Sequence, residues 1–304
     1  MTIAILGVGG VGGLLAGALE HAGERVLVVA RDETAAVIGA SGLRVQSVSL
    51  GELVTHPRVA AALEEPVEVL VVATKATGLE PALERIRTDP ALVLPLLNGL
   101  DHVALLRERF APASVLAGSI RVESDRPQPG LIVHTSPFLR VDMASRARSA
   151  RAGMETLAHT LSNAGVPARV LDSEAQVMWS KLVRLNALAC TTSAHDKLLG
   201  EIRSTPALRA ELEAAIVEAC AVGRAEGAHD VDPATALAEL ERAHDTLGSS
   251  MQRDIAAGRE PELDAIPGSV LRAAARHDLR CPTIERLVAM IAERAHIPAP
   301  LPAR

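Results

Sequence analysis

The chain opens on the stretch Thr2-Ile3-Ala4-Ile5-Leu6-Gly7-Val8-Gly9-Gly10-Val11-Gly12, which decides the fold. An apolar run ends in the glycine pattern G-x-G-x-x-G, and a helix-forming segment follows at once. A strand, a glycine turn and a helix in this order are typical of a dinucleotide-binding unit. The pattern predicts a cofactor-binding segment made of Gly7, Val8, Gly9, Gly10, Val11 and Gly12.

Each glycine of the pattern has a physical task. Gly7 allows a tight turn, Gly9 lets the backbone approach a pyrophosphate, and Gly12 lets the helix pack against the strand. The phosphates would bind the free N–H groups at the helix start, where the helix dipole favours negative charge. The alternative is a glycine-rich turn that binds no ligand. It is less favoured because the strand before the turn and the helix after it also match a dinucleotide-binding unit.

The first half of the chain alternates between strand-like and helix-like segments. The expected strands are nearly all apolar, as in a parallel sheet buried on both faces, and comprise residues 2–6, 25–30, 67–73 and 92–97. The expected helices lie between them, at 10–22, 33–40, 79–88 and 101–110. This alternation predicts a doubly wound, Rossmann-type α/β sheet. Shorter strands over 115–142, a helix over 148–164 and a strand over 166–171 complete this half.

After Asp172 the strand signals stop. Helical patterns cover 173–194, 205–227, 233–246, 267–277 and 283–295. The sequence therefore predicts a dinucleotide-binding domain over 1–172 and an all-helical substrate and catalytic domain over 173–296. The proline-rich end, 297–304, is expected to be a mobile tail.

Composition excludes several classes of protein. The net charge is −6 and no basic block is present, so no nucleic-acid partner is expected. The three cysteines, Cys190, Cys220 and Cys281, lack metal-ligand or disulfide spacing and indicate buried thiols in a reducing compartment. No apolar stretch reaches about 20 residues, the length of a membrane span, and the N-terminus lacks the basic region of a signal peptide. We expect no metal site, no membrane contact and a cytoplasmic location.

The residues after the second expected strand bear on the choice of nicotinamide cofactor. An acidic residue there binds the ribose 2′-hydroxyl of NAD, whereas an arginine accommodates the 2′-phosphate of NADP. Arg31 comes first and favours NADP, while Asp32 follows at the spacing of an NAD-binding acid. NADPH is therefore the expected cofactor, with NAD as the alternative.

Several short motifs occur together across the chain. They are Leu97-Asn98-Gly99, Trp179-Ser180-Lys181-Leu182, Ser249-Ser250-Met251-Gln252-Arg253-Asp254 and Glu262-Leu263-Asp264-Ala265-Ile266-Pro267-Gly268. With the glycine pattern, they make the chain resemble the ketopantoate reductase family from residue 1 to about 295. Arg31 and Lys75 also stand where such enzymes carry residues that contact the cofactor.

The resemblance implies an NADPH-dependent reductase of a small-molecule 2-oxo acid, with a place in pantothenate biosynthesis. Lys181 occupies the position of the lysine that protonates the forming alkoxide. Glu262 corresponds to a glutamate near that lysine, Ser250 to a serine that binds the substrate, and Asn98 to an asparagine at the nicotinamide end of the site. An ammonium group beside the carbonyl polarises it and supplies the proton.

The sequence departs from the family at three polar positions. Leu185, Ala189 and Leu199 stand where the family usually has asparagines. Asn186 lies five residues after the lysine, off its helix face, whereas Arg184 lies three residues after it and is a candidate to bind the substrate carboxylate. A site without these amides predicts a substrate more apolar than ketopantoate.

Two other functions remain open from the sequence. One is an NAD-dependent hydroxy-acid dehydrogenase working in the oxidative direction. The other is a non-catalytic NADP-binding sensor, which the missing asparagines favour and the retained Lys181, Ser250 and Glu262 disfavour. The helical half is rich in alanine and leucine, so a homodimer is also left open.

Overall fold

The opening stretch forms the strand, turn and helix that its residues predict. In the computed structural model, which describes residues 1–300, β1 (Thr2–Leu6) leads through the glycine turn into α1 (Gly10–His21). Every side chain of β1 from Ile3 to Leu6 is buried, as expected for a strand covered on both faces. The core here is aliphatic, because the chain has only two phenylalanines and one tryptophan.

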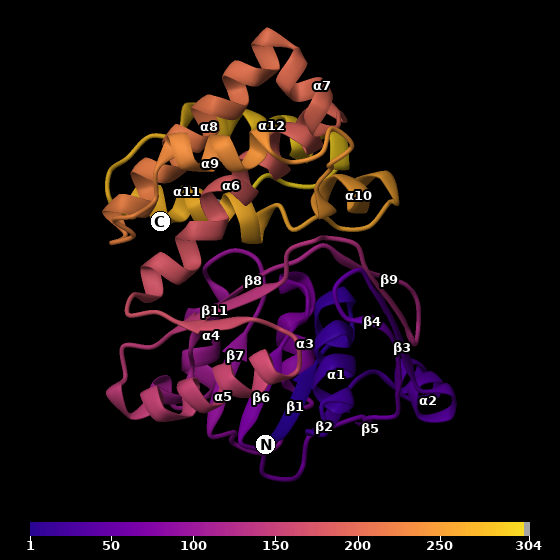
Figure 1. Cartoon of the computed structure of the whole chain (residues 1–304). Helices are drawn as coiled ribbons and strands as arrows, with labels where there is room; N and C mark the ends of the chain where they lie inside the picture. Colours follow the sequence, from indigo (N-terminus) through magenta and orange to yellow (C-terminus); the bar gives the residue numbers. More distant parts are fainter. Residues whose placement is uncertain (301–304) are drawn as a thin grey trace. The chain divides into compact units, whose positions relative to one another are not determined.

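A five-stranded parallel sheet is the centre of the first unit (Figure 1). Its strands, in spatial order, are β5 (Arg58–Ala60), β2 (Arg25–Val29), β1, β6 (Val69–Val72) and β7 (Leu92–Pro95). The strand order reverses between β1 and β6, where doubly wound sheets bind ligands beyond the carboxyl ends of the strands. The expected Rossmann-type architecture is therefore confirmed.

Two smaller sheets complete the first unit. One has the order β4 (Gly51–Thr55), β3 (Leu43–Ser47), β10 (Leu131–His134) and β9 (Ser124–Gln128). The other has the order β12 (Ala168–Val170), β11 (Arg140–Ala144) and β8 (Ala117–Arg121). The sequence did not predict β3, β4 or β5.

Helix α1 lies against the four-stranded sheet as well as the parallel one. A Cβ atom added at Gly13 would lie 2.3 Å from the side chain of Ile132, and one added at Gly17 would lie 2.5 Å from Val45. These two glycines are four residues apart and so share one face of the helix. Because this face has no side chains at these two positions, β3 and β10 can pack directly on α1. Their packing fixes the position of α1, whose N-terminus follows the glycine turn.

The remaining helices of the first unit are α2 (Asp32–Ser41), α3 (Leu79–Leu83), α4 (His102–Arg109) and α5 (Arg151–Asn163), with single turns at η1 (Ala76–Gly78), η2 (Pro112–Ser114) and η3 (Arg148–Ala150). The helix expected over 79–88 ends at Leu83. Its last residues leave the helix because the backbone at 85–87 bonds to Leu63 instead, through both its N–H and its C=O. Tertiary pairing thus overrides local helix propensity here.

The regular secondary structure of the second unit is helical in its described part (Figure 1). Its elements are α6 (Glu174–His195), α7 (Leu199–Ser204), α8 (Pro206–Ala225), α9 (Pro233–Glu241), α10 (Ser250–Ala256), the π-helical turn η4 (Asp264–Gly268), α11 (Ser269–Arg276) and α12 (Pro282–Ala295). The sequence did not predict α7, α10 or η4. Trp179 of α6 packs on α8 at Gly223, where an added Cβ would lie 3.0 Å from the indole.

The chain divides slightly differently from the sequence-based expectation. The first unit comprises Met1–Leu97 and His102–Val177, and the second comprises Asn98–Asp101 and the chain from Met178 onward. The expected boundary at 172 thus falls a few residues early, and the short segment Asn98–Asp101 belongs with the helical unit. Of the expected tail 297–304, residues 297–300 form neither helix nor strand, and 301–304 lie outside the described residues.

Candidate functional site

The glycine turn has the geometry that its pattern predicts. Gly7 has a φ of +95°, and an added Cβ would lie within 3.0 Å of Thr74 and the carbonyl of Ala73. A Cβ added at Gly12 would lie 1.9 Å from the carbonyl oxygen of Gly7. Gly9 differs, because nothing lies within 4 Å of the position its Cβ would take. The turn is therefore closed at Gly7 and Gly12 and open to an incoming group at Gly9.

The start of α1 is free to bind an anion. Gly9 stands at the N-cap position without a side-chain cap, and the first turn of α1 holds no acidic residue. The N–H groups of the first turn have no partner within the helix, and the dipole places partial positive charge there. The residues of the turn therefore fit the diphosphate of a dinucleotide.

Two residues beside the turn were not found from the sequence. The Oγ of Ser124 on β9 donates a hydrogen bond to the carbonyl of Gly10 at 2.9 Å, and a Cβ added at Gly10 would lie 2.2 Å from the carbonyl oxygen of Ser124. The Oγ1 of Thr74 is buried and has no hydrogen-bond partner among the described residues. A buried hydroxyl without a partner is costly, so Thr74 suits a polar group of a ligand. In the sequence, the signal for Thr74 is its position directly after a buried strand.

The predicted cofactor-binding cations stand at strand ends. Arg31 directly precedes α2, is exposed, and follows β2, which pairs with β1 on one side. Lys75 follows β6, which pairs with β1 on the other side, and is exposed at the start of η1. Asp32 occupies the first turn of α2, so the arginine and the acid both remain beside the expected ribose position.

A buried histidine links β3 and β10 in the first unit. Ser136 Oγ donates to the carbonyl of Phe138 at 2.7 Å, so His134 Nε2–H donates to Ser136 Oγ at 3.2 Å. His134 Nδ1 then accepts from Ser47 Oγ at 2.8 Å, which describes a neutral imidazole. Burial lowers the pKa of His134 below its usual value, against opposing interactions with the backbone of Phe138 and with Glu123.

Three residues singled out from the sequence form one hydrogen-bonded chain in the second unit. Lys181 Nζ donates to Asn98 Oδ1 at 2.9 Å, and Asn98 Nδ2 donates to Glu262 Oε2 at 3.1 Å. The amide thus turns its carbonyl to the ammonium and its N–H to the carboxylate, and each bond is strengthened by the charged partner. Lys181 and Glu262 are thus both hydrogen-bonded to Asn98.

Local structure explains how Asn98 reaches Glu262. Gly99 has a φ of +86°, and an added Cβ would lie 1.9 Å from the carbonyl oxygen of Ala265. The Asn98-Gly99 pair therefore packs closely against η4. Pro267 lies inside η4 and has no N–H to donate, and Gly268 N instead donates to Leu263 O, five residues earlier. Such π turns are frequent at functional sites.

The two serines of the Ser249-Ser250 pair have different environments. Ser249 caps α10, since its Oγ accepts from the N–H of Gln252 at 3.0 Å and from Thr192 Oγ1 at 2.9 Å. Ser250 is the first residue of the helix and is half-buried. The cap of α10 is therefore Ser249, and the hydroxyl of Ser250 is not used for capping.

The positions that depart from the family pattern are apolar in the structure as well. Leu185 follows Lys181 by one turn of α6 and is half-buried, and Ala189 and Leu199 are fully buried. Asn186 is also fully buried, and its Oδ1 accepts from the thiol of Cys190 rather than reaching the lysine.

Arg184 has an acidic partner of its own. Its Nε lies 3.2 Å from Oε2 of Glu239 on α9. A substrate carboxylate would therefore compete with Glu239 for the guanidinium, and the binding role of Arg184 stays a prediction.

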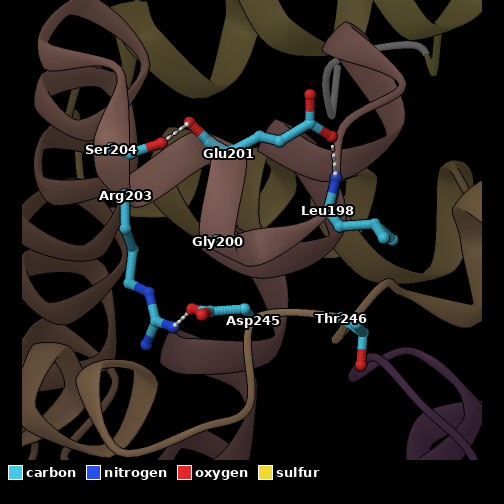
Figure 2. A pocket seen from close by; sticks show the side chains of 7 residues that line it. All are labelled: Leu198, Gly200, Glu201, Arg203, Ser204, Asp245 and Thr246. Carbon is cyan, nitrogen blue, oxygen red and sulfur yellow. Dashed lines mark hydrogen bonds and ion pairs between the residues drawn. The ribbon is translucent and has the colours of Figure 1, made fainter.

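A hollow on the second unit is lined by the segments around Leu198 and Asp245 (Figure 2). Its volume is about 550 Å³, and its lining comprises Leu198, Gly200, Glu201, Arg203, Ser204, Asp245 and Thr246. Arg203 pairs with Asp245 and donates to the carbonyls of Leu240, Glu241 and Ala243. These bonds satisfy the end of α9, so the polar lining is structural.

Two other kinds of feature are absent from residues 1–300. No group of three His, Cys, Asp or Glu side chains there is arranged to hold a metal ion. In the same residues, every helix is too short or too polar to cross a bilayer. The three cysteines are buried free thiols, as expected.

Comparisons with known proteins agree with the resemblance found in the sequence. The family described as "Ketopantoate reductase PanE/ApbA" matches residues 3–145, and its C-terminal family matches residues 175–295. A 2-dehydropantoate 2-reductase of Mycobacterium tuberculosis (strain H37Rv) is 31% identical over 300 residues, which cover 95% of this chain and 96% of that protein.

Two solved structures share the fold over nearly the whole chain. A 2-dehydropantoate 2-reductase of Geobacter metallireducens GS-15 aligns with a TM-score of 0.88 and 23% identity, over 96% of this chain and 99% of that one. The ternary structure of D-mandelate dehydrogenase with NADH and anilino(oxo)acetate aligns with a TM-score of 0.87 and 21% identity, over 97% and 99%. With family matches across both halves, the chain belongs to the ketopantoate reductase family.

Proposed function

We propose that this oxidoreductase reduces the keto group of a 2-oxo acid to a hydroxyl, with NADPH as cofactor and Lys181 as the proton donor. The hydrogen-bonded chain from Lys181 through Asn98 to Glu262 carries this proposal. A sensor that only bound a nucleotide would have no use for an ammonium group held by an amide and a buried carboxylate.

The cofactor would be held by the first unit. The N–H groups at residues 10–12 would bind the diphosphate, and Thr74 Oγ1 offers a further hydrogen bond beside Gly7. Exposed Arg31 and Lys75 would contact the phosphates of the adenosine half and the ribose. The bound cofactor supplies the hydride for the carbonyl carbon.

Lys181 has two tasks in this proposal. Its ammonium polarises the carbonyl oxygen before reduction and gives that oxygen a proton as negative charge develops. Asn98 Oδ1 fixes the direction of Nζ, and Glu262 in turn fixes Asn98 by accepting from its Nδ2. Ser250, which does not cap α10, would donate its hydroxyl to the substrate carboxylate, with Arg184 as a second candidate.

We infer that the substrate carries an apolar side chain. Leu185, Ala189 and Leu199 offer no hydrogen bond to the terminal hydroxyl of ketopantoate, and burial of an unpaired hydroxyl costs about 1–3 kcal/mol. A fold neighbour, D-mandelate dehydrogenase, was solved with anilino(oxo)acetate, a small carboxylate that carries an aromatic ring. The alternative is ketopantoate itself and a place in pantothenate biosynthesis.

A matched pair of substrates tests this inference. Ketopantoate and 3,3-dimethyl-2-oxobutanoate differ only by the terminal hydroxyl. We expect kcat/KM to be at least equal for the compound without the hydroxyl, whereas a site built to bind that hydroxyl would disfavour it by a large factor, about 10⁴-fold in well-adapted sites. A strong preference for ketopantoate would contradict the apolar substrate and leave the reductase function intact.

The NAD-dependent hydroxy-acid dehydrogenase is the second candidate. Asp32 in the first turn of α2 favours it, and the D-mandelate dehydrogenase structures contain NADH. Fluorescence titration with NADPH and NADH decides between the two, because Arg31 should give NADPH the tighter binding. The homodimer and the cytoplasmic location stay predictions from the sequence.

A further inference from the structure

We propose that Arg272 is a positioning residue. It would hold the side chains of Asn98 and Glu262 within hydrogen-bonding distance of each other and so fix the orientation of the Lys181 ammonium group. This inference rests on the proposed role of Lys181. Arg272 lies on α11, ten residues after Glu262 in the sequence. It belongs to the same unit as Lys181, Asn98 and Glu262.

The guanidinium of Arg272 joins two separate segments. Its Nε and one terminal nitrogen donate to Asp101 Oδ2 at 3.2 and 2.6 Å. The terminal nitrogens also donate to Asp264 Oδ1 at 2.7 Å, to Asp264 Oδ2 at 3.1 Å and to the Asp264 carbonyl at 2.9 Å. The planar guanidinium can bind both aspartates at once because its donors point in fixed directions. One terminal nitrogen has two hydrogens and three acceptors, so one of its N–H groups is shared.

The two aspartates are close in sequence to the site residues. Asp101 ends the segment that begins with Asn98, and Asp264 follows Glu262 by two residues. Gly99, between Asn98 and Asp101, packs against Ala265 so closely that no side chain fits there. Arg272 therefore ties together the two segments that present the amide and the carboxylate to each other.

The three side chains are exposed enough that their ion pairs should contribute little to the stability of the whole fold. Arg272 is 20% exposed, Asp101 48% and Asp264 72%. Ion pairs with partners this exposed contribute only about 0–1 kcal/mol to folding. A displacement of the Asn98 segment by 1 Å, however, is enough to cost about 100-fold in rate. The loss of Arg272 should therefore affect the site far more than the melting temperature.

The same helix supplies a matched control. Arg276 lies one turn after Arg272 on α11 and pairs with Glu226 at 3.1 Å, away from the Asn98 segment in sequence. Arg276→Met removes an arginine and its ion pair from the same helix without touching Asp101 or Asp264, although Arg276 is more exposed than Arg272, at 49% against 20%. Asp101→Asn is the complementary variant, since it weakens the link to the Asn98 segment and leaves Asp264 paired with Arg272.

The chain allows a direct readout of Lys181, because it has only three lysines, Lys75, Lys181 and Lys197. Limited acetylation of the full-length protein with acetic anhydride, followed by mass spectrometry, gives the labelling of Lys181 relative to Lys197. Lys197 pairs with Glu201 on the exposed surface and serves as the internal reference. An amine that loses the acceptor fixing it becomes more available to the reagent.

We expect Arg272→Met and Asp101→Asn to raise the labelling ratio of Lys181 to Lys197 several-fold, and Arg276→Met to leave it unchanged. With 3,3-dimethyl-2-oxobutanoate, kcat should fall about tenfold or more in Arg272→Met, while the Kd of NADPH stays unchanged. Equal labelling ratios in Arg272→Met, Asp101→Asn and Arg276→Met would overturn the positioning role. If the unmodified protein reduces no 2-oxo acid, the proposed function fails, and the labelling ratio still decides the role of Arg272.

Discussion

Lys181 Nζ and Asn98 Oδ1 lie 2.9 Å apart, although 83 residues separate them in sequence. The asparagine also donates to Glu262, so a neutral amide connects the ammonium to the carboxylate. A direct ion pair would hold the lysine proton between two charged groups. With the amide between them, Lys181 donates to a neutral oxygen, and our proposal is that another of its protons serves a carbonyl oxygen.

Removal of the amide should impair the chemical step. Asn98→Ala leaves Lys181 and Glu262 without their common partner, so we expect kcat to fall about 10²-fold, in the range of a misplaced catalytic group. Steady-state assays with NADPH and 3,3-dimethyl-2-oxobutanoate measure this. Asn163→Ala, at the end of α5, is the control. An Asn98→Ala enzyme with unchanged kcat would exclude the amide from the mechanism.

The geometry of the glycine turn predicts that one glycine substitution weakens cofactor binding and that another destabilises the fold. Gly9→Ala places a methyl in the open space before α1 and should weaken NADPH binding while the melting temperature stays the same. Gly12→Ala forces a Cβ to within 1.9 Å of a carbonyl oxygen and should cost about 3 kcal/mol of unfolding free energy.

Gly39 on α2 is the matched control, because nothing lies within 4 Å of its added Cβ. Gly39→Ala should raise the unfolding free energy by about 0.5–1 kcal/mol. Isothermal titration with NADPH and urea unfolding measure the two effects. If Gly9→Ala bound NADPH as tightly as the unmodified chain, the proposed diphosphate site would be wrong.

A single substitution should shift substrate preference. Leu185→Asn restores an amide one turn after Lys181, where the family usually has one, and offers a partner to a substrate hydroxyl. We expect the ratio of kcat/KM for ketopantoate over 3,3-dimethyl-2-oxobutanoate to rise about tenfold, the effect of one hydrogen bond of about 1.4 kcal/mol. Asn186→Leu changes a neighbouring residue that faces elsewhere and should leave the ratio unaltered. An unchanged ratio in Leu185→Asn would place Leu185 outside the substrate site.

The buried imidazole of His134 predicts a pH dependence of stability. Burial lowers its pKa in the folded state, so the unfolded chain binds a proton more readily than the folded chain. This contribution to stability is therefore present above the unfolded pKa of about 6.5 and is lost as the pH falls below it.

Urea unfolding at pH 7.5 and 5.5 checks this dependence. His134→Gln should reduce the difference in unfolding free energy between the two pH values, whereas a substitution of exposed His159 should not. The same difference in His134→Gln and in the unmodified protein would assign the dependence to other groups.

The sequence predicted the parallel sheet and most helices correctly because their signals are local. The strands β1, β2, β6 and β7 are continuous apolar runs, and α8, α9 and α12 each begin with proline. By contrast, β3 and β4 contain alternating and exposed residues, among them Val54 at 60% exposure. They pair with each other, and β3 also pairs with β10. No local pattern in the sequence reveals these partners.

The candidate site could likewise be predicted from the sequence only in part. The motifs identified Lys181, Asn98 and Glu262 one by one, but their order in the hydrogen-bonded chain depends on the packing of Gly99 against η4. Thr74 and Arg272 carried no motif at all. The roles proposed for them rest on a hydroxyl left without a partner and on a guanidinium shared by two segments. Only the folded chain brings these features about.

The most direct measurement compares Lys181→Ala with the unmodified protein in two assays on the same preparations: NADPH binding by fluorescence, and oxidation of NADPH by 3,3-dimethyl-2-oxobutanoate. The account predicts equal affinity for NADPH and a turnover reduced about 10²- to 10⁴-fold, the range of general acid catalysis. Equal turnover in the two proteins would show that another group supplies the proton, and the central role given to Lys181 would be wrong.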